Sequence, residues 1–550
     1  MKTNKKYLFL ILFLSISVFA EACTNLIVGK KASADGSVIC TYNCDGFGFA
    51  ASMSYIPAGM HEKGELQAIH GWGPNHDNAF VAMPSYTYGV VGLMNDHQLS
   101  IVETTFDGRL ELVNEEGLLD YFSLMKLTLQ RCTTAREAIL CMDRLTQEYG
   151  YNSSGESFAI CDKNEAWIME MMGKGPRRKG SVWVAMRVPD DCICAYANLS
   201  RIRQFPLKDK ENCLYSKDVI SFARSIGLYS GADKDFSWRD TYCPIDFENV
   251  RYGDARVWSF FRHHVENKSD WDKYLSYING NFSTYDHLPL WIKPNKPLAL
   301  REVMEDMRDH YEGTELDMST DMSAGPWASP YRAKDINFKA EDGTTLFRER
   351  PIGCQQSGMT MVCQMRNWLP DEVGGVCYFN LDDASMVAYV PCYCGITNVP
   401  EPFRSENNNI LEFSEESAFW ICNWVANMVY PRYSAMISDL KDAQKEVEDY
   451  YANDQKSVED TVCKMTRSDR VDYLTDKSIR YTDFMMKRWK KLAHFLIVKH
   501  NDQIMRQSKD GVIIPGRYSA PQYSSSFINA IKQQTGSRYQ PKQVIQRRQR

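Results

Sequence analysis

The stretch that decides the fold begins at Cys23 and reads CTNLIVGKKASADGS over residues 23–37, followed by VICT over residues 38–41. Residues 24–28 are rich in β-branched and apolar side chains, which favour a strand. Asp35-Gly36 then supplies the residue types that a tight turn needs. Residues 37–41 are strand-like again, so the sequence predicts a β-hairpin whose first strand starts next to Cys23.

The residues before Cys23 have the layout of a secretory signal peptide. Three lysines lie within the first six residues, residues 7–19 are a largely apolar run of 13, and Ala20-Glu21-Ala22 is an A-x-A cleavage site. The run is too short to cross a membrane as a helix, which takes about 20 residues. We expect residues 1–22 to be removed and a soluble protein, without a transmembrane span, to reach the periplasm or the extracellular space.

Cleavage after Ala22 makes Cys23 the first residue of the mature chain. A cysteine at this position is diacylated in lipoproteins, which have an aliphatic residue three before it and a small residue two before it. Those positions hold Ala20 and Glu21 here. Because Glu is a poor match, the sequence disfavours lipid anchoring at Cys23, which would block both its thiol and its amine.

Charge and composition exclude several classes of protein. The 550 residues include 64 Lys or Arg and 70 Asp or Glu, a net charge of −6, and 44% are hydrophobic. This is the composition of a globular protein, and it has no overall basic footprint for nucleic acid. Residues 511–550 are the exception, with seven Lys or Arg and no Asp or Glu. They are typical of a basic, poorly ordered tail.

All 17 cysteines follow the expected cleavage site. Sixteen remain once Cys23 is set aside, an even number in an exported protein, so we expect some disulfides beside buried free thiols. The pairs Cys192/Cys194 and Cys392/Cys394 are C-x-C, not the paired C-x₂₋₄-C of a structural zinc site. The sequence also has no Walker loop, dinucleotide glycine motif or G-x-S-x-G elbow. We therefore expect neither a metal nor a cofactor.

Short strands separated by turn residues predict antiparallel sheets, joined by a few helices. Thr134-Ala135-Arg136-Glu137 is a capping box that predicts a helix to about residue 148. The apolar run over residues 386–390 predicts a buried strand. Further expectations are helices over 116–129, 414–430 and 435–451, and a cover of helices and loops over 212–322.

An N-terminal cysteine has unusual chemistry. Its α-amine has a reference pKa of about 7.7–8.0 and its thiol one of about 8.5. The amine can take the proton of the thiol directly or through one water, so no separate histidine is needed. The remaining requirement is a set of hydrogen-bond donors for a tetrahedral oxyanion.

Residues 23–37 closely resemble the opening of the secreted cysteine dipeptidases among the N-terminal-nucleophile hydrolases, relatives of penicillin V acylase and the bile-salt hydrolases. The resemblance continues to about residue 500, in the segments 92–95, 103–104, 165–170, 183–191, 197–202, 325–327, 389–391 and 419–420. It implies an α+β fold, the four-layer αββα sandwich of that superfamily, with additional C-terminal helices. It also implies hydrolysis of the amide bond of dipeptides.

The resemblance assigns four catalytic positions. Cys23 is the nucleophile and its α-amine the base, Asp45 holds and orients that amine, and Asn95 and Asn198 stand near the reacting carbonyl as oxyanion donor and positioning group. A turn or strand-end role is the alternative for Asn95 and Asn198, and Asp45-Gly46 also reads as an ordinary turn.

Dipeptide recognition requires a carboxylate for the free substrate amine, and Glu170 and Asp317 are our candidates. Relatives usually carry Arg three residues before the catalytic Asp, where this chain has Tyr42. A neutral Tyr lowers the pKa of a thiol less than a cation does. Our candidates for a cation that compensates for the missing charge at position 42 are Arg187, Arg201 and Arg366.

These expectations divide the chain into a signal peptide (1–22), a catalytic domain (23–410), a helical region packed on it (411–510) and a basic tail (511–550). Two alternatives remain open. In the first, the protein hydrolyses other small amides, such as acylated amino acids. In the second, it is a catalytically silent binding protein on the same scaffold.

Overall fold

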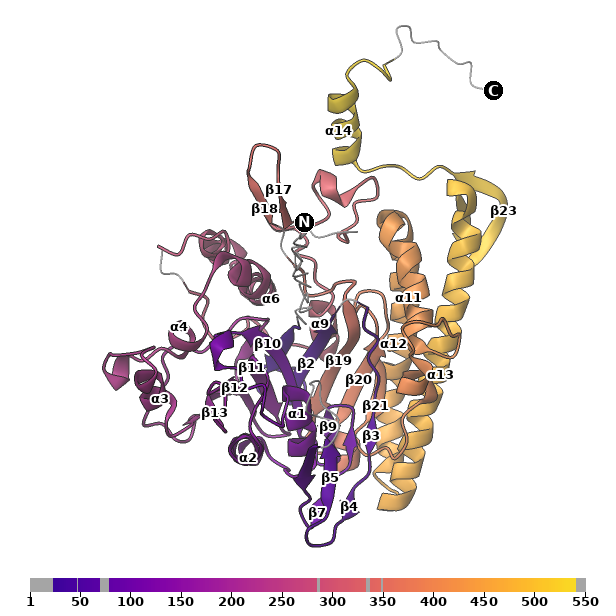
Figure 1. Cartoon of the computed structure of the whole chain (residues 1–550). Helices are drawn as coiled ribbons and strands as arrows, with labels where there is room; N and C mark the ends of the chain where they lie inside the picture. Colours follow the sequence, from indigo (N-terminus) through magenta and orange to yellow (C-terminus); the bar gives the residue numbers. More distant parts are fainter. Residues whose placement is uncertain are drawn as a thin grey trace, which may run out of the picture.

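The structure is a computed structural model, and it describes residues 23–46, 48–69, 79–283, 287–332, 337–347 and 350–540. The predicted signal peptide and the last ten residues of the predicted tail lie outside these ranges. Helices and strands combine in an α+β fold (Figure 1). Within the described ranges, no helix is both long enough and apolar enough to cross a membrane.

Two large antiparallel sheets form the centre of the molecule (Figure 1). The seven-stranded sheet has the order β16 (Trp291–Ile292), β14 (Ile193–Tyr196), β1 (Asn25–Val28), β2 (Val38–Asp45), β19 (Ser357–Met365), β20 (Val376–Leu381), β21 (Val390–Tyr393). The eight-stranded sheet has the order β15 (Cys213–Tyr215), β13 (Ser181–Val188), β12 (Ala166–Gly173), β11 (Gly155–Cys161), β10 (Ser100–Asp107), β9 (Met94–Asn95), β8 (Val90–Val91), β3 (Tyr55–Ile56).

The predicted N-terminal hairpin is confirmed as β1 and β2. Ile27 lies opposite Cys40 and Val28 opposite Ile39, and Gly36 takes a positive φ of 88° in the connection between the strands. All eight residues of β2 are buried, because the strand lies inside its sheet and also contacts β10 and β11 of the other sheet.

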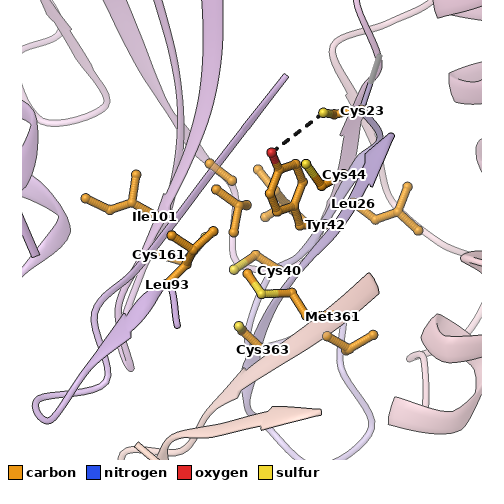
Figure 2. Close-up of a cluster of buried hydrophobic side chains, with 14 of the residues drawn as sticks. Cys23, Leu26, Cys40, Tyr42, Cys44, Leu93, Ile101, Cys161, Met361 and Cys363 are labelled. Carbon is orange, nitrogen blue, oxygen red and sulfur yellow. Dashed lines mark hydrogen bonds between the residues drawn. The ribbon is translucent and has the colours of Figure 1, made fainter. Parts of the chain in front are cut away.

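Apolar and sulfur-containing side chains fill the space between the sheets, as Figure 2 shows for Cys40, Cys161 and Cys363. All 17 cysteines are free, and only Cys463 is exposed. The expectation of some disulfides is therefore wrong for this structure. Buried thiols pack here as small apolar side chains.

Helices cover both sheets. The eight-stranded sheet contacts α1 (Tyr121–Leu129) and α2 (Ala135–Tyr149), and the seven-stranded sheet contacts α11 (Ala418–Val429), α12 (Tyr433–Val462) and α13 (Arg467–His500). Figure 1 shows α12 and α13 along the side of the seven-stranded sheet that faces away from the other sheet. The Thr134 cap is confirmed, because its hydroxyl accepts the Glu137 N–H at 3.3 Å. Helix α1 starts later than predicted, where Asp120 caps it.

The predicted cover over residues 212–322 is confirmed for its short helices and loops, but the segment also supplies the edge strands β15 and β16. The helices are α3 (Val219–Ser225), α4 (Trp238–Tyr242), α5 (Phe247–Asn249), α6 (Ala255–His263), α7 (Lys268–Trp271), α8 (Leu275–Ile278) and α9 (Leu300–Asp306). The smaller elements elsewhere are α10 (Asp371–Gly374), β4 (Gly59–Met60), β5 (Leu66–Ile69), β6 (Ala79–Ala82), β7 (Tyr86–Thr87), β17 (Asn337–Lys339) and β18 (Thr345–Phe347).

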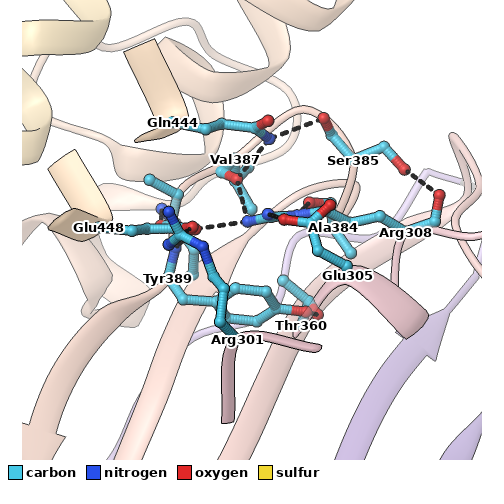
Figure 3. Close-up of polar contacts among 12 residues, drawn as sticks. Arg301, Glu305, Arg308, Thr360, Ala384, Ser385, Val387, Tyr389, Gln444 and Glu448 are labelled. Carbon is cyan, nitrogen blue, oxygen red and sulfur yellow. Dashed lines mark hydrogen bonds and ion pairs between the residues drawn. The ribbon is translucent and has the colours of Figure 1, made fainter. Parts of the chain in front are cut away.

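The strand predicted over residues 386–390 is wrong except for its last residue, where β21 begins. The segment is a buried turn whose backbone carbonyls are bound by side chains (Figure 3). Arg308 donates to the carbonyls of Ala384 and Val387, at 2.9 and 3.2 Å. Gln444 of α12 donates to the carbonyls of Ser385 and Val387, at 2.8 and 2.9 Å. These donors satisfy buried polar groups that a strand ladder would otherwise pair.

The described part of the predicted tail contains regular structure. After α13 the chain forms a hairpin, β22 (Met505–Lys509) and β23 (Val512–Ser519), and then the exposed helix α14 (Ser525–Thr535). The N–H of Ser524 donates to the carbonyl of Pro326 at 2.9 Å, so α14 is tied to the body at its N-terminus. The basic composition alone predicted a less ordered segment.

Candidate active site

The hairpin brings Cys23 and Asp45 to the same end of the seven-stranded sheet. Thr24 and Asn43 lie opposite each other and exchange backbone hydrogen bonds of 3.1 and 3.0 Å. Cys23, one residue before this pair, is completely buried. In the full-length chain its nitrogen is bonded to Ala22, so it is an amide and not a free α-amine.

The Cys23 thiol faces a phenol and a carboxylate. Its Sγ lies 3.6 Å from the Tyr42 hydroxyl (Figure 2) and 3.9 Å from Glu103 Oε1, and the Tyr42 hydroxyl donates a hydrogen bond to the same oxygen of Glu103. Burial raises the pKa of the Cys23 thiol well above its ordinary value, with further contributions from the Cys44 thiol and the negative charge of Glu103. In the full-length chain the Cys23 side chain is therefore a protonated thiol.

A buried arginine holds the backbone of Cys23. Arg256 of α6 donates to the Cys23 carbonyl at 2.7 Å, to the Thr24 hydroxyl at 2.6 Å and to Asn198 Oδ1 at 2.8 Å. Burial and the nearby charge of Arg350 lower the pKa of Arg256 to about 10, so it remains a cation at neutral pH. Asn198 has a positive φ of 52° and donates to the carbonyl of Thr105 at 2.7 Å.

A second arginine pairs with Asp45. Arg350 donates to Asp45 Oδ2 at 2.7 Å, and the Ser357 hydroxyl donates to Oδ1 at 2.5 Å. Burial raises the pKa of Asp45, while Arg350 and Ser357 oppose that shift. We refer to Cys23, Tyr42, Asp45, Glu103, Asn198, Arg256 and Arg350 together as the Cys23 cluster.

Asn95 is not brought to Cys23 by the structure. Its amide donates to the carbonyls of Leu129 and Cys132, at 2.8 and 2.7 Å. Its Oδ1 accepts the backbone N–H groups of His97 and Leu99, both at 3.0 Å. Both amide hydrogens are thus bound to carbonyls at the end of α1 and just after it, and Oδ1 is bound within the turn of Asn95 itself. The side chain has no hydrogen left for an oxyanion, and these contacts fit the alternative turn role.

The two carboxylates expected to bind substrate are bound to other groups. Glu170 accepts hydrogen bonds from the Ser200 hydroxyl and the Arg201 N–H, both at 2.5 Å, and from the Ile202 N–H at 3.1 Å. We call Glu170, Ser200, Arg201 and Ile202 the Glu170 network. Asp317 accepts from Gly313 and Ser319 within its own loop. Neither residue is in the Cys23 cluster.

The cations proposed as compensation for Tyr42 are also engaged elsewhere. Arg187 pairs with Glu165 and Asp190, Arg201 with Asp254, and Arg366 with Glu459. Arg256 and Arg350 are the arginines of the Cys23 cluster, and the sequence analysis identified neither of them. The available signal for Arg256 was its position between the apolar residues Ala255 and Val257 of a helical segment, which indicates a buried arginine that needs partners.

Among the described residues, no group of three or more His, Cys, Asp or Glu side chains is arranged to hold a metal ion. The cluster instead combines a buried thiol with paired charges held at hydrogen-bond distance. A buried thiol with charged groups at hydrogen-bond distance is the combination that a cysteine nucleophile requires.

The chain belongs to peptidase family C69, whose model matches residues 22–68 and 73–446. The protein is thus a peptidase. It is 26% identical over 402 residues to a "Probable dipeptidase" of Salmonella dublin, covering 68% of this chain and 81% of that protein. It is 23% identical over 446 residues to a "Probable dipeptidase" of Latilactobacillus sakei (78% and 85%). The "Dipeptidase A" of Lactobacillus helveticus is 23% identical over 448 residues (76% and 84%).

Proposed function

We propose that the protein is an exported dipeptidase that hydrolyses the peptide bond of dipeptides with Cys23 as an N-terminal nucleophile. The family and the names of its relatives support the activity. The observation that carries the assignment of the nucleophile is the burial of the Cys23 thiol within the charged cluster.

Removal of residues 1–22 activates the site. Hydrolysis of the Ala22–Cys23 bond frees an α-amine beside the thiol, and Asp45 holds that amine in place. The amine accepts the thiol proton, and the sulfur attacks the carbonyl carbon of the substrate. As the tetrahedral intermediate collapses, the amine returns the proton to the leaving amino group. Water then hydrolyses the thioester and releases the first amino acid.

Arg256 and Asn198 are positioning residues in this scheme. Arg256 fixes the carbonyl of Cys23, and Asn198 fixes the guanidinium of Arg256. Such contacts maintain the direction of the nucleophile, and misplacement by about 1 Å can cost about a hundredfold in rate.

The arrangement of the sheets supports a fold proposal as well. Two stacked antiparallel sheets with helices on each are consistent with the four-layer αββα sandwich of the N-terminal-nucleophile hydrolases. In this proposal residues 23–410 form the catalytic domain, and α11–α13 belong to a helical region over 411–510 that packs on it.

The test is hydrolysis of alanyl-alanine by protein that begins at Cys23, compared with Cys23→Ala and with the uncleaved precursor. We expect activity only in the processed wild type, and mass spectrometry should show an unmodified Cys23 at its N-terminus. Equal activity in Cys23→Ala would refute the proposal. Faster hydrolysis of an acylated amino acid than of any dipeptide would favour the acylase alternative.

A further inference from the structure

Glu103 is a buried carboxylate that touches the nucleophile. It lies on β10, it is completely buried, and its Oε1 is 3.9 Å from Cys23 Sγ. The Tyr42 hydroxyl donates to the same oxygen and holds it there. A negative charge in this place raises the pKa of the thiol, which opposes formation of the thiolate. Its presence therefore indicates a role other than activation of the sulfur.

A second carboxyl group, Glu156 of β11, forms a hydrogen bond with Glu103. Thr105 donates to Glu156 Oε1 at 2.9 Å. Burial and the charge of Glu103 raise the pKa of Glu156 well above its ordinary value. Glu156 is thus the protonated member of the pair and can donate its hydrogen to Glu103.

The two arginines of the Cys23 cluster hold the nucleophile and the neighbouring carboxylate. Arg256 is bound to the Cys23 carbonyl and Asn198, and Arg350 to Asp45. The Tyr42 hydroxyl donates to Glu103 Oε1 and so orients that carboxylate toward the thiol without adding a positive charge.

The distances fit the amino end of a dipeptide. The ammonium nitrogen of a peptide is two bonds, about 2.5 Å, from the carbonyl carbon of the same residue. A thiol poised for attack is about 3–3.5 Å from that carbon. The ammonium nitrogen therefore lies within about 6 Å of the sulfur. A carboxylate oxygen 3.9 Å from the sulfur can accept its charge-assisted hydrogen bond of about 2.8 Å.

We propose that Glu103, oriented by Tyr42, binds the α-ammonium group of the substrate and so restricts the enzyme to peptides with a free amino terminus. This inference rests on the proposed dipeptidase function. It assigns to Glu103 the recognition of the substrate amine, the role for which the sequence analysis suggested Glu170 and Asp317. It also disfavours the acylase alternative, because an acylated nitrogen has no charge to offer a buried carboxylate.

The test uses processed protein and two substrates that differ only at the amino end, alanyl-alanine and N-acetyl-alanyl-alanine. Wild type should favour the free amine at least a hundredfold in kcat/KM. Glu103→Gln should lose about a hundredfold on alanyl-alanine, mainly through KM, and change less than threefold on the acetylated substrate. The matched control is Asp162→Asn, another buried carboxylate, in the connection between β11 and β12. It binds the Ala135 N–H at 2.8 Å, and the variant should retain the wild-type preference.

Three results would overturn the inference. One is an equal loss by Glu103→Gln on both substrates, which would assign Glu103 to the nucleophile or its amine. Another is full activity of Glu103→Gln on alanyl-alanine. The third needs no variant, because equal rates of wild type on the two substrates would exclude a requirement for the ammonium group. By contrast, wild type without activity on any dipeptide would refute the proposed function itself.

Binding can be measured apart from catalysis. Titration calorimetry of alanyl-alanine into Cys23→Ala should give a dissociation constant at least tenfold lower than into Cys23→Ala with Glu103→Gln. Equal constants would contradict the assignment of Glu103 even if the turnover data agreed with it.

Discussion

Glu103 and Glu170 stand on strands of the same sheet, and both are completely buried. Around Glu170, two backbone N–H groups and a hydroxyl occupy the carboxylate. Around Glu103, the contacts are a phenol, a second carboxyl group and the candidate nucleophile. The difference shows that burial does not identify a functional carboxylate. The groups around the carboxylate identify its role. Backbone donors indicate a structural role in fixing a loop, whereas a reactive neighbour indicates a role in chemistry.

The largest expected effect on activity comes from removing Arg256, one of the two cations of the Cys23 cluster. Arg256→Met should lower kcat/KM on alanyl-alanine by about 10²–10³-fold, because the carbonyl of Cys23 and Asn198 lose their shared donor. Arg187→Met is the control. It removes partly exposed ion pairs and should change kcat/KM less than twofold. A loss below tenfold in folded Arg256→Met would argue against its positioning role.

The largest expected effect on stability comes from removing the carboxylate of the Glu170 network. Glu170→Ala should lower the free energy of unfolding by about 3–5 kcal/mol, because buried N–H groups of Arg201 and Ile202 and the Ser200 hydroxyl lose their acceptor. Urea unfolding measures the loss. The free-amine preference of the folded fraction should persist. A changed preference would contradict the assignment of a structural role to Glu170 and of substrate recognition to Glu103.

A pH experiment sharpens the same distinction. Burial raises the pKa of Glu170 to about 7, from an ordinary 4.5. Because the folded state holds the proton more tightly, the stability from this group is complete below pH 4.5 and is lost as the pH rises through 7. Glu170→Gln cannot ionise. Its stability relative to wild type should rise between pH 4.5 and 7.5, by at most on the order of 3 kcal/mol. Parallel pH curves from urea unfolding would contradict this account.

The smallest effect is expected at Tyr42. Tyr42→Phe removes the hydroxyl that orients Glu103, and kcat/KM on alanyl-alanine should fall about fivefold, equivalent to about 1 kcal/mol. Steady-state kinetics should place the change in KM. Tyr242→Phe loses a buried hydroxyl that contacts the Val219 carbonyl and serves as the matched control. If the two variants behave alike, the Tyr42 hydroxyl has no specific part in binding.

Local sequence signals predicted much of the fold. The hairpin of β1 and β2 follows from its turn residues, and the start of α2 follows from the Thr134 cap. The strand predicted at residues 386–390 was wrong because Arg308 and Gln444, distant in sequence, bind its carbonyls. Such contacts have no local pattern.

The same limit applies to the site. Cys23 could be proposed from the sequence because its position after an A-x-A motif is a local feature. Arg256 is 233 residues away from Cys23, and Arg350 is 305 residues away from Asp45. Only the paired sheets and the helices over 212–322 bring these residues together. Glu170 was a reasonable candidate as a carboxylate in a strand, but its backbone donors depend on where the 197–202 segment folds back.

The burial of sixteen of the seventeen cysteine thiols has a practical use. A maleimide dye added to the native protein should attach at Cys463, just beyond the end of α12, and should spare the interior. The number of dyes per molecule then measures global unfolding, and it should rise from one toward seventeen as denaturant is added. In the proposed scheme, a second dye acquired when residues 1–22 are removed would report that the Cys23 thiol has become accessible.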